Sequence, residues 1–166
     1  MNRKKLVSVV VLILVGLAAF WWLRPPSEAE RVAKRVAALA ECLNKNAGET
    51  NTVMALKFNS LSGMFADPVT VDISEMNFNG TYSSSEIPSL VSRYRAMLDS
   101  LALAFHDLAV TLDGADRATA TFTARATLRA RNGQEQTETH EVHAQLRKVD
   151  DKWVFTRFHE ENVLVR

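Results

Sequence analysis

The chain of 166 residues has one cysteine, only six glycines, and no marked excess of either charge. Cys42 therefore cannot form an internal disulfide, and we expect it to be a small buried residue. The sequence contains no glycine-rich phosphate loop and no G-x-S-x-G nucleophile elbow. All 19 acidic residues but only 16 of the 20 Lys and Arg lie after position 24, a net charge of about −3 that argues against nucleic-acid binding.

One long uncharged stretch, residues 6–23, stands near the start of the chain and has a single clearly polar side chain, Ser8. As a helix it would extend about 27 Å, close to the roughly 30 Å hydrocarbon core of a bilayer. Its length and its end in Phe20, Trp21 and Trp22 favour a retained single-pass anchor, because signal peptides have a shorter apolar region and small residues at the cleavage site. Cleavage is the alternative interpretation.

Flanking charges predict how this anchor is oriented. Arg3, Lys4 and Lys5 precede the stretch, whereas only Arg24 follows it closely, so the positive-inside rule places the N-terminus in the cytoplasm. We therefore expect a bacterial inner-membrane protein whose single domain lies in the periplasm. The predicted divisions are a cytoplasmic tail (1–5), a transmembrane helix (6–23), a linker (24–27) and one domain (28–166).

Helical periodicity begins directly after the linker. Ser27 and Glu30 match a capping box, and apolar residues recur every three or four positions from Val32 to a helix end near Asn46. We expect Val53, Leu56 and Leu61 to be the candidates for burial on a second helix. This second helix should cover residues 53–61. A third helix, capped by Ser84 or Ser85, should continue to about Ser100.

From Leu103 onward the apolar period changes to two, which indicates β-strands. Between 117 and 131, alanines and large apolar residues alternate with threonines and arginines, so one face should be dry and the other wet. A shorter strand is expected at 69–73. Turns are predicted at 113–114, 132–133 and 150–151. The pattern predicts an α+β domain with about three helices packed on a curved, mostly antiparallel sheet.

Two segments carry a resemblance to a known family. The segment 65–72 (F-A-D-P-V-T-V-D) and the closing segment 146–153 (L-R-K-V-D-D-K-W), in this order of helices and strands, resemble the NTF2-like superfamily, including its SnoaL-like members. The resemblance covers about residues 28–162 and implies a cone with a pocket at its wide end. Such cones host isomerases, dehydratases, epoxide hydrolases and polyketide cyclases, and also non-catalytic binding domains, so fold alone does not choose among them.

One catalytic branch of this superfamily lacks its key residue here. In the ketosteroid isomerase branch the base is an Asp that follows the acidic residue closing the 65–72 segment, and that position is Ile73. Asp72 is one residue away, and a shift of one residue along a strand points a side chain to the opposite face. That branch also needs an early Tyr donor, whereas the only tyrosines are Tyr82 and Tyr94.

The candidate acid/base groups are two histidines and a tyrosine. His106 and His140 are expected to face the helix-covered side of the sheet, with Tyr94 reaching from the third helix, and Phe65 and Phe122 are expected to line the same pocket. No carboxylate is evidently placed to orient either imidazole. The alternative is that both histidines are hydrogen-bonded core or rim residues.

Metal binding and cofactor binding are not expected. His140 and His143 are three residues apart on a predicted strand, which sends them to opposite faces, so they should not chelate one metal ion. His159 could equally be a surface residue. The arginines of the wet face, Arg125, Arg129 and Arg131, are expected to form a solvated surface or a docking face for a protein partner or a second copy.

Two functional classes follow from these features. The first is a non-catalytic, membrane-anchored binding or scaffolding domain that meets a protein partner or a small apolar ligand, because a tether raises the effective concentration for neighbouring complexes. An immunity or stress-type envelope protein is not distinguished from it by residues alone. The second is a SnoaL-like isomerase, cyclase or hydrolase that uses His106, His140 or Tyr94 as acid/base groups.

Overall fold

The computed structural model describes residues 13, 15, 24–73 and 78–161. The predicted transmembrane segment lies outside this part of the chain except for Ile13 and Val15, so the anchor stays a prediction. Within the described residues, no helix is both long enough and apolar enough to cross a bilayer. Residues 24–27, the predicted linker, have no regular secondary structure.

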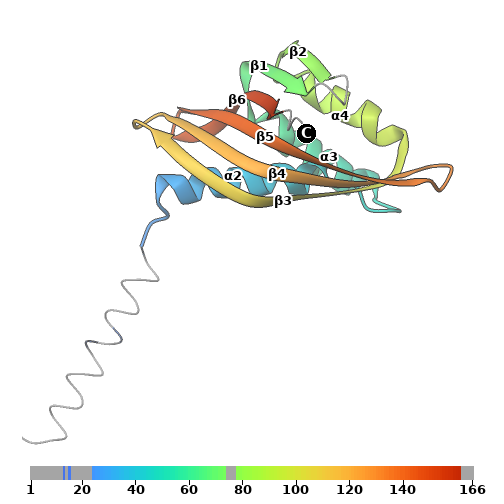
Figure 1. Cartoon of the computed structure of the whole chain (residues 1–166), viewed down its shortest axis with the longest axis horizontal. Helices are drawn as coiled ribbons and strands as arrows, with labels where there is room; N and C mark the ends of the chain where they lie inside the picture. The colour runs from blue at the N-terminus through green and yellow to red at the C-terminus, as the bar shows by residue number, and fades with distance from the viewer. Residues whose placement is uncertain (1–12, 14, 16–23, 74–77, 162–166) are drawn as a thin grey trace, which may run out of the picture.

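The described part of the chain folds into one mixed helix and sheet domain (Figure 1). Its strands form a six-stranded sheet in the order β2-β1-β6-β5-β4-β3, antiparallel throughout except for the parallel pair β1 and β6. This is the α+β architecture that the sequence predicts. The elements are α2 (Glu28–Leu43), α3 (Asn51–Ser62), β1 (Phe65–Ile73), β2 (Phe78–Tyr82), α4 (Ile87–Ala96), β3 (Leu98–Asp113), β4 (Arg117–Ala130), β5 (Glu135–Val149) and β6 (Lys152–Glu161).

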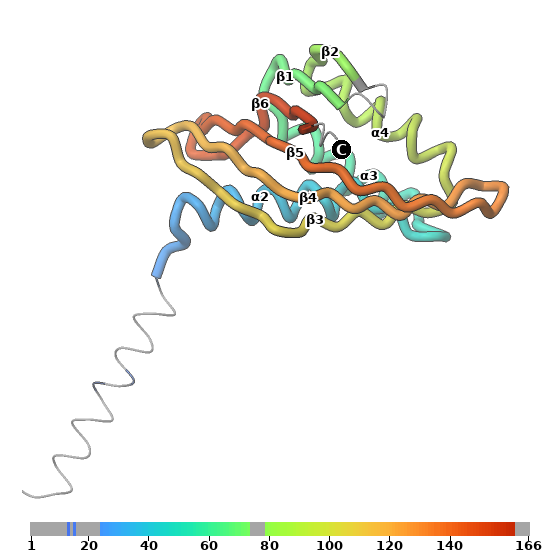
Figure 2. Tube along the Cα trace, in the orientation of Figure 1, coloured from blue at the N-terminus to red at the C-terminus, as the bar shows by residue number. Residues whose placement is uncertain are grey.

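Helix α2 packs across one face of the sheet, which we call the inner face; the opposite face is the outer face. The capping box is present, because Ser27 Oγ accepts from the Glu30 amide (3.2 Å) and the Ser27 amide donates to Glu30 (2.8 Å). Val32 and Val36 are fully buried against the sheet. Figure 2 shows the long strands β3, β4 and β5 running side by side over this helix. The alternation predicted for β4 is observed, with its alanines and Phe122 facing the core.

Two predictions about the other helices are wrong. On α3 only Leu61 is buried, whereas Val53 and Leu56 are 43% and 65% exposed, because the apolar residues of this helix do not form one stripe and periodicity could not identify its packed side. Helix α4 ends at Ala96 instead of near Ser100. The following residues pair with the end of β4 and already belong to β3.

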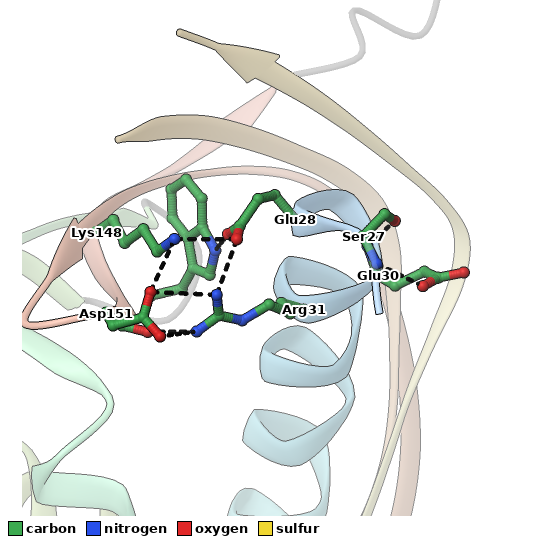
Figure 3. Close-up of polar contacts among 7 residues, drawn as sticks. Ser27, Glu28, Glu30, Arg31, Lys148 and Asp151 are labelled. Atoms are coloured by element: carbon green, nitrogen blue, oxygen red, sulfur yellow. Dashed lines mark hydrogen bonds and ion pairs between the residues drawn. The ribbon is translucent and has the colours of Figure 1, made fainter. Parts of the chain in front are cut away.

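A polar cluster fastens the start of α2 to the β5–β6 turn (Figure 3). The carboxylate of Glu28 accepts hydrogen bonds from Arg31 (2.8 Å), Lys148 (3.0 Å) and the indole N–H of Trp153 (2.8 Å). Arg31 and Lys148 also contact the Asp151 carboxylate at 3.0 and 2.9 Å. Residues 120 positions apart in sequence are thereby joined at one end of the domain.

This cluster should make stability depend on pH. Hydrogen bonds from Arg31 and Lys148 lower the pKa of Asp151 to about 2, and those from Lys148 and Trp153 lower the pKa of Glu28. A carboxyl group whose pKa is lowered by folding stabilises the fold above its unfolded pKa of about 4 and loses this contribution as the pH falls toward 2. We therefore expect the thermal unfolding midpoint, followed by circular dichroism, to decrease between pH 5 and pH 2.

The double variant Glu28→Gln with Asp151→Asn should show a smaller decrease over the same pH range. Asp113→Asn is the matched control, because Asp113 is another exposed carboxylate, 3.4 Å from Arg117, but lies outside the cluster. Equal pH dependence of the double variant and the unmodified chain would contradict the prediction.

Candidate functional site

A cavity of about 220 Å³ lies between the inner face of the sheet, the end of α2 and one side of α4. Its wall is almost wholly apolar and includes Leu39 from α2, Leu90 from α4 and Phe158 from β6. The cavity is partly open to solvent. An engineered apolar cavity of about 150 Å³ binds benzene, so this space is large enough for a small ring compound or a short chain.

The structure places four of the expected pocket residues in this wall: Phe65, Tyr94, Phe122 and His140. Each comes from a different element, β1, α4, β4 and β5 respectively. Ile73 also lines the cavity, so the position that holds the base in the ketosteroid isomerase branch faces the pocket but carries no titratable group.

His106 does not reach the cavity, and the expectation that it faces the helices is wrong. Between His106 and Ala109, β3 has one residue more than its partner β4, and Asp107 adopts a positive φ of 53° at this bulge. An extra residue in one strand reverses the alternation of side chains beyond it. Val110 therefore packs on the core, whereas His106 is exposed on the outer face.

His140 is held by a carboxylate that the sequence analysis did not identify. Its Nδ1 lies 2.6 Å from Oε1 of Glu160 on the neighbouring strand β6, and the two side chains are only 11% and 5% exposed. Nε2 of His140 lies 3.6 Å from Oε2 of Glu138 on its own strand. The expectation that no carboxylate orients this imidazole is therefore wrong.

A second bulge brings Glu160 to the inner face. Between the pairs Gln145–Arg157 and Leu146–Phe155, β6 has one residue more than β5. Regular alternation from Phe155 would have turned His159 inward and Glu160 outward. With the bulge, Glu160 is buried beside His140 and His159 is exposed.

Tyr94 and Glu138 are the other polar groups beside His140. Burial raises the pKa of Tyr94, and the nearby negative charge of Glu138 raises it further, so the phenol keeps its proton at neutral pH. Glu138 also accepts a hydrogen bond of 2.8 Å from the Gln136 amide. The cavity wall therefore holds a proton donor, an imidazole and one carboxylate, Glu138, while Glu160 contacts His140 without lining the cavity.

The other histidines lie away from the cavity. His143 and His159 face each other across β5 and β6 on the outer face, with Nε2 of His143 2.7 Å from Glu161 and Nδ1 of His159 3.2 Å from Asp72. His140 and His143 thus lie on opposite faces, as their spacing predicts. In the part of the chain that the structure describes, no group of three or more His, Cys, Asp or Glu side chains is arranged to hold a metal ion.

The curved sheet, the helices on its inner face and the apolar cavity between them define an NTF2-like cone. The sequence profile of the family described as "SnoaL-like domain" matches residues 35–159, and the chain belongs to this family. A search of curated proteins finds no significant match.

Several solved structures share the fold. A proposed aromatic ring hydroxylase from Novosphingobium aromaticivorans has a TM-score of 0.68 and 15% identity, with 85% of this chain and 93% of that chain covered. A proposed scytalone dehydratase from the same organism has a TM-score of 0.66 and 12% identity, with 81% and 83% covered. The CaMKII hub of S. rosetta has a TM-score of 0.63 and 18% identity, with 83% and 98% covered. At these identities the likeness shows the fold alone.

Proposed function

We propose that this domain binds a small, largely apolar molecule in the cone cavity. The carrying observation is the cavity itself, a space of about 220 Å³ with an almost wholly apolar wall and partial access to solvent. Pockets of this kind, with a few convergent polar groups, are the usual form of small-molecule sites. His140, Tyr94 and Glu138 supply those polar groups at one side of the wall.

We also propose that residues 6–23 hold this domain at the bacterial inner membrane, with the domain in the periplasm. The uncharged stretch and the basic residues before it support this placement. Apolar molecules concentrate in bilayers, so an anchored cone would lie close to their main reservoir. This placement agrees with a binding role and does not require catalysis.

Binding can be tested by filling the cavity. Ala124 lines the cavity and pairs with His140 across the strands, whereas Ala104 is exposed on the outer face. We expect 2-naphthylmethanol to bind the full chain in lipid nanodiscs, with empty nanodiscs as the blank, when measured by isothermal titration calorimetry. Ala124→Phe should weaken binding by more than about tenfold, a change of about 1.4 kcal/mol.

Ala104→Phe is the control and should bind like the unmodified chain. Binding that is equally strong in the Ala124→Phe variant would place the ligand elsewhere and would contradict the proposal.

Acid/base conversion of the bound molecule is a second candidate function. The hydrogen bond between His140 Nδ1 and Glu160 favours it, because a carboxylate in this position orients the ring and stabilises the imidazolium that forms when Nε2 takes a proton. Dehydration of an apolar β-hydroxy ketone is a suitable test reaction, since it needs a base for the α-proton and a proton donor for the leaving hydroxyl. Tyr94 could supply that donor.

The test compares two histidines on the same strand. If the domain is catalytic, His140→Gln should lower the dehydration rate by about 10²–10⁴, the usual contribution of a general base. His143→Gln changes a histidine of the outer face and should leave the rate unchanged. Absence of turnover in the unmodified chain, with ligand binding intact, would leave the binding function and exclude this reaction.

A further inference from the structure

A second hollow adjoins the cone cavity. This groove, of about 490 Å³, lies between the end of α4 and the hairpin that joins β4 and β5. In contrast to the cavity, its wall includes several polar side chains, among them Gln134, Glu135 and Gln136. The groove is therefore suited to a hydrated or charged group, whereas the cavity is suited to an apolar one.

Tyr94 and Glu138 line both spaces. These two side chains, one from α4 and one from β5, therefore form a wall that the cavity and the groove share. A molecule longer than the cavity would have to pass between them to place its apolar part inside and its polar end in the groove. Because Glu138 is half-buried, its charge is less screened here than on the open surface.

The charges around this junction are mainly negative. The groove is lined by two carboxylates, Glu135 and Glu138, and by no Lys or Arg among the described residues. Glu135 is 3.9 Å from Arg129 on the surface, whereas Glu138 has a neutral amide, Gln136, and an imidazole as its nearest polar partners. The charges that line the groove therefore favour a cation there.

The cavity wall also contains a cation, Arg95, which lies in the last turn of α4. Arg95 lines the cavity, but its guanidinium is paired with the buried carboxylate of Glu49 and lies over the ring of Phe58. The positive charge of Arg95 thus already has a counter-ion, Glu49. Among the described residues Glu138 has no Lys or Arg partner, and the basic group beside it is the imidazole of His140, at 3.6 Å.

We propose that the ligand is an amphiphile with a cationic head group, whose apolar part fills the cone cavity and whose ammonium group binds between Glu138 and Tyr94. This proposal rests on the proposed binding function and adds the chemical class of the ligand. The Glu138 carboxylate accepts the charged hydrogen bond at the position where it and Tyr94 line both spaces. The groove beyond them holds the hydrated remainder of the head group.

Three probes with the same ring system and different head groups test this. They are 2-naphthylmethylamine, 2-naphthylmethanol and 2-naphthoate, titrated by calorimetry at neutral pH into the full chain in nanodiscs of zwitterionic lipid. We expect the amine to bind about tenfold more tightly than the alcohol, because a hydrogen bond between two charged groups is stronger than one from a neutral hydroxyl, although partial exposure of Glu138 weakens it. The naphthoate should bind most weakly.

Two matched glutamate variants on β5 test whether Glu138 causes the preference for the amine over the alcohol. Glu138→Gln should bring the ratio of amine to alcohol affinity close to one. Glu141→Gln removes a carboxylate of the outer face and should keep the ratio of the unmodified chain.

The outcomes separate the two proposals. If the alcohol binds and the amine binds no more tightly, the head-group proposal is overturned and the binding function stands. Tightest binding of naphthoate also overturns it, and would indicate that Arg95 dominates the site. If none of the probes binds the unmodified chain, the binding function fails, and the head-group proposal fails with it.

Discussion

Replacing Phe155 by alanine is expected to lower the free energy of unfolding by about 3–5 kcal/mol, the usual cost of removing a large aromatic side chain from a core. Phe155 is fully buried in β6, and its ring centroid lies 5.9 Å from that of Phe65 and 5.0 Å from that of Phe158. Its amide also donates a 2.9 Å hydrogen bond to the carbonyl of Met64. The substitution would leave a void at the point where β1 and β6 meet.

Urea unfolding followed by circular dichroism measures this loss. Leu56→Ala is the control, since Leu56 is a similarly apolar residue that is 65% exposed on α3 and should change stability by less than about 0.5 kcal/mol. Equal losses in the two variants would mean that Phe155 does not occupy the core position described.

Replacing Glu49 by glutamine is expected to cost about 3–5 kcal/mol, because breaking a buried ion pair leaves a charge without its partner. Glu49 and Arg95 have only 5% and 3% of their side chains exposed, and Glu49 also lies 2.5 Å from Nζ of Lys57. The variant would leave two cations with no carboxylate between them. Arg95 belongs to α4, so the loss should also loosen the helix that forms one wall of the cavity.

A double-mutant cycle separates the ion pair from other effects. Removing both charges, with Glu49→Gln and Arg95→Met, should be less damaging than the sum of the single changes, by about 0.5–3 kcal/mol. Glu135→Gln is the control, because its partner Arg129 is 3.9 Å away on an exposed surface and such pairs contribute about 0–1 kcal/mol. Additive losses from Glu49→Gln and Arg95→Met would show that the pair is not coupled.

Local signals in the sequence were sufficient where a structural feature depends on neighbouring residues. The capping box at Ser27 and Glu30 predicted where α2 begins, and strict alternation predicted which side chains of β4 enter the core. The same reasoning failed for α3, where apolar residues lie around the whole helix and only contacts with α2 and α4 select the buried side. Strand β2 was not predicted at all, since it is short and depends on pairing with β1.

The candidate site was predictable in its residue types and only partly in its geometry. The positions of Tyr94 and His140 in the wall follow from helix and strand periodicity. The pairing of His140 with Glu160 does not, because the two residues are 20 positions apart and the register of β5 against β6 decides whether they meet. The signal that could have pointed to it is the spacing of Phe155 and Phe158, two large apolar residues three apart in a strand, which indicates a bulge between them.

The sequence by itself determined the α+β class, the resemblance to a cone with a pocket, and the apolar character of the residues that line it. Tertiary structure alone decided that His106 faces outward, that Glu160 faces His140, and that Tyr94 and Glu138 line both the cavity and a polar groove. The physical reason is that a bulge of one residue reverses every side chain beyond it, while its position is set by hydrogen bonds between strands and not by local propensity.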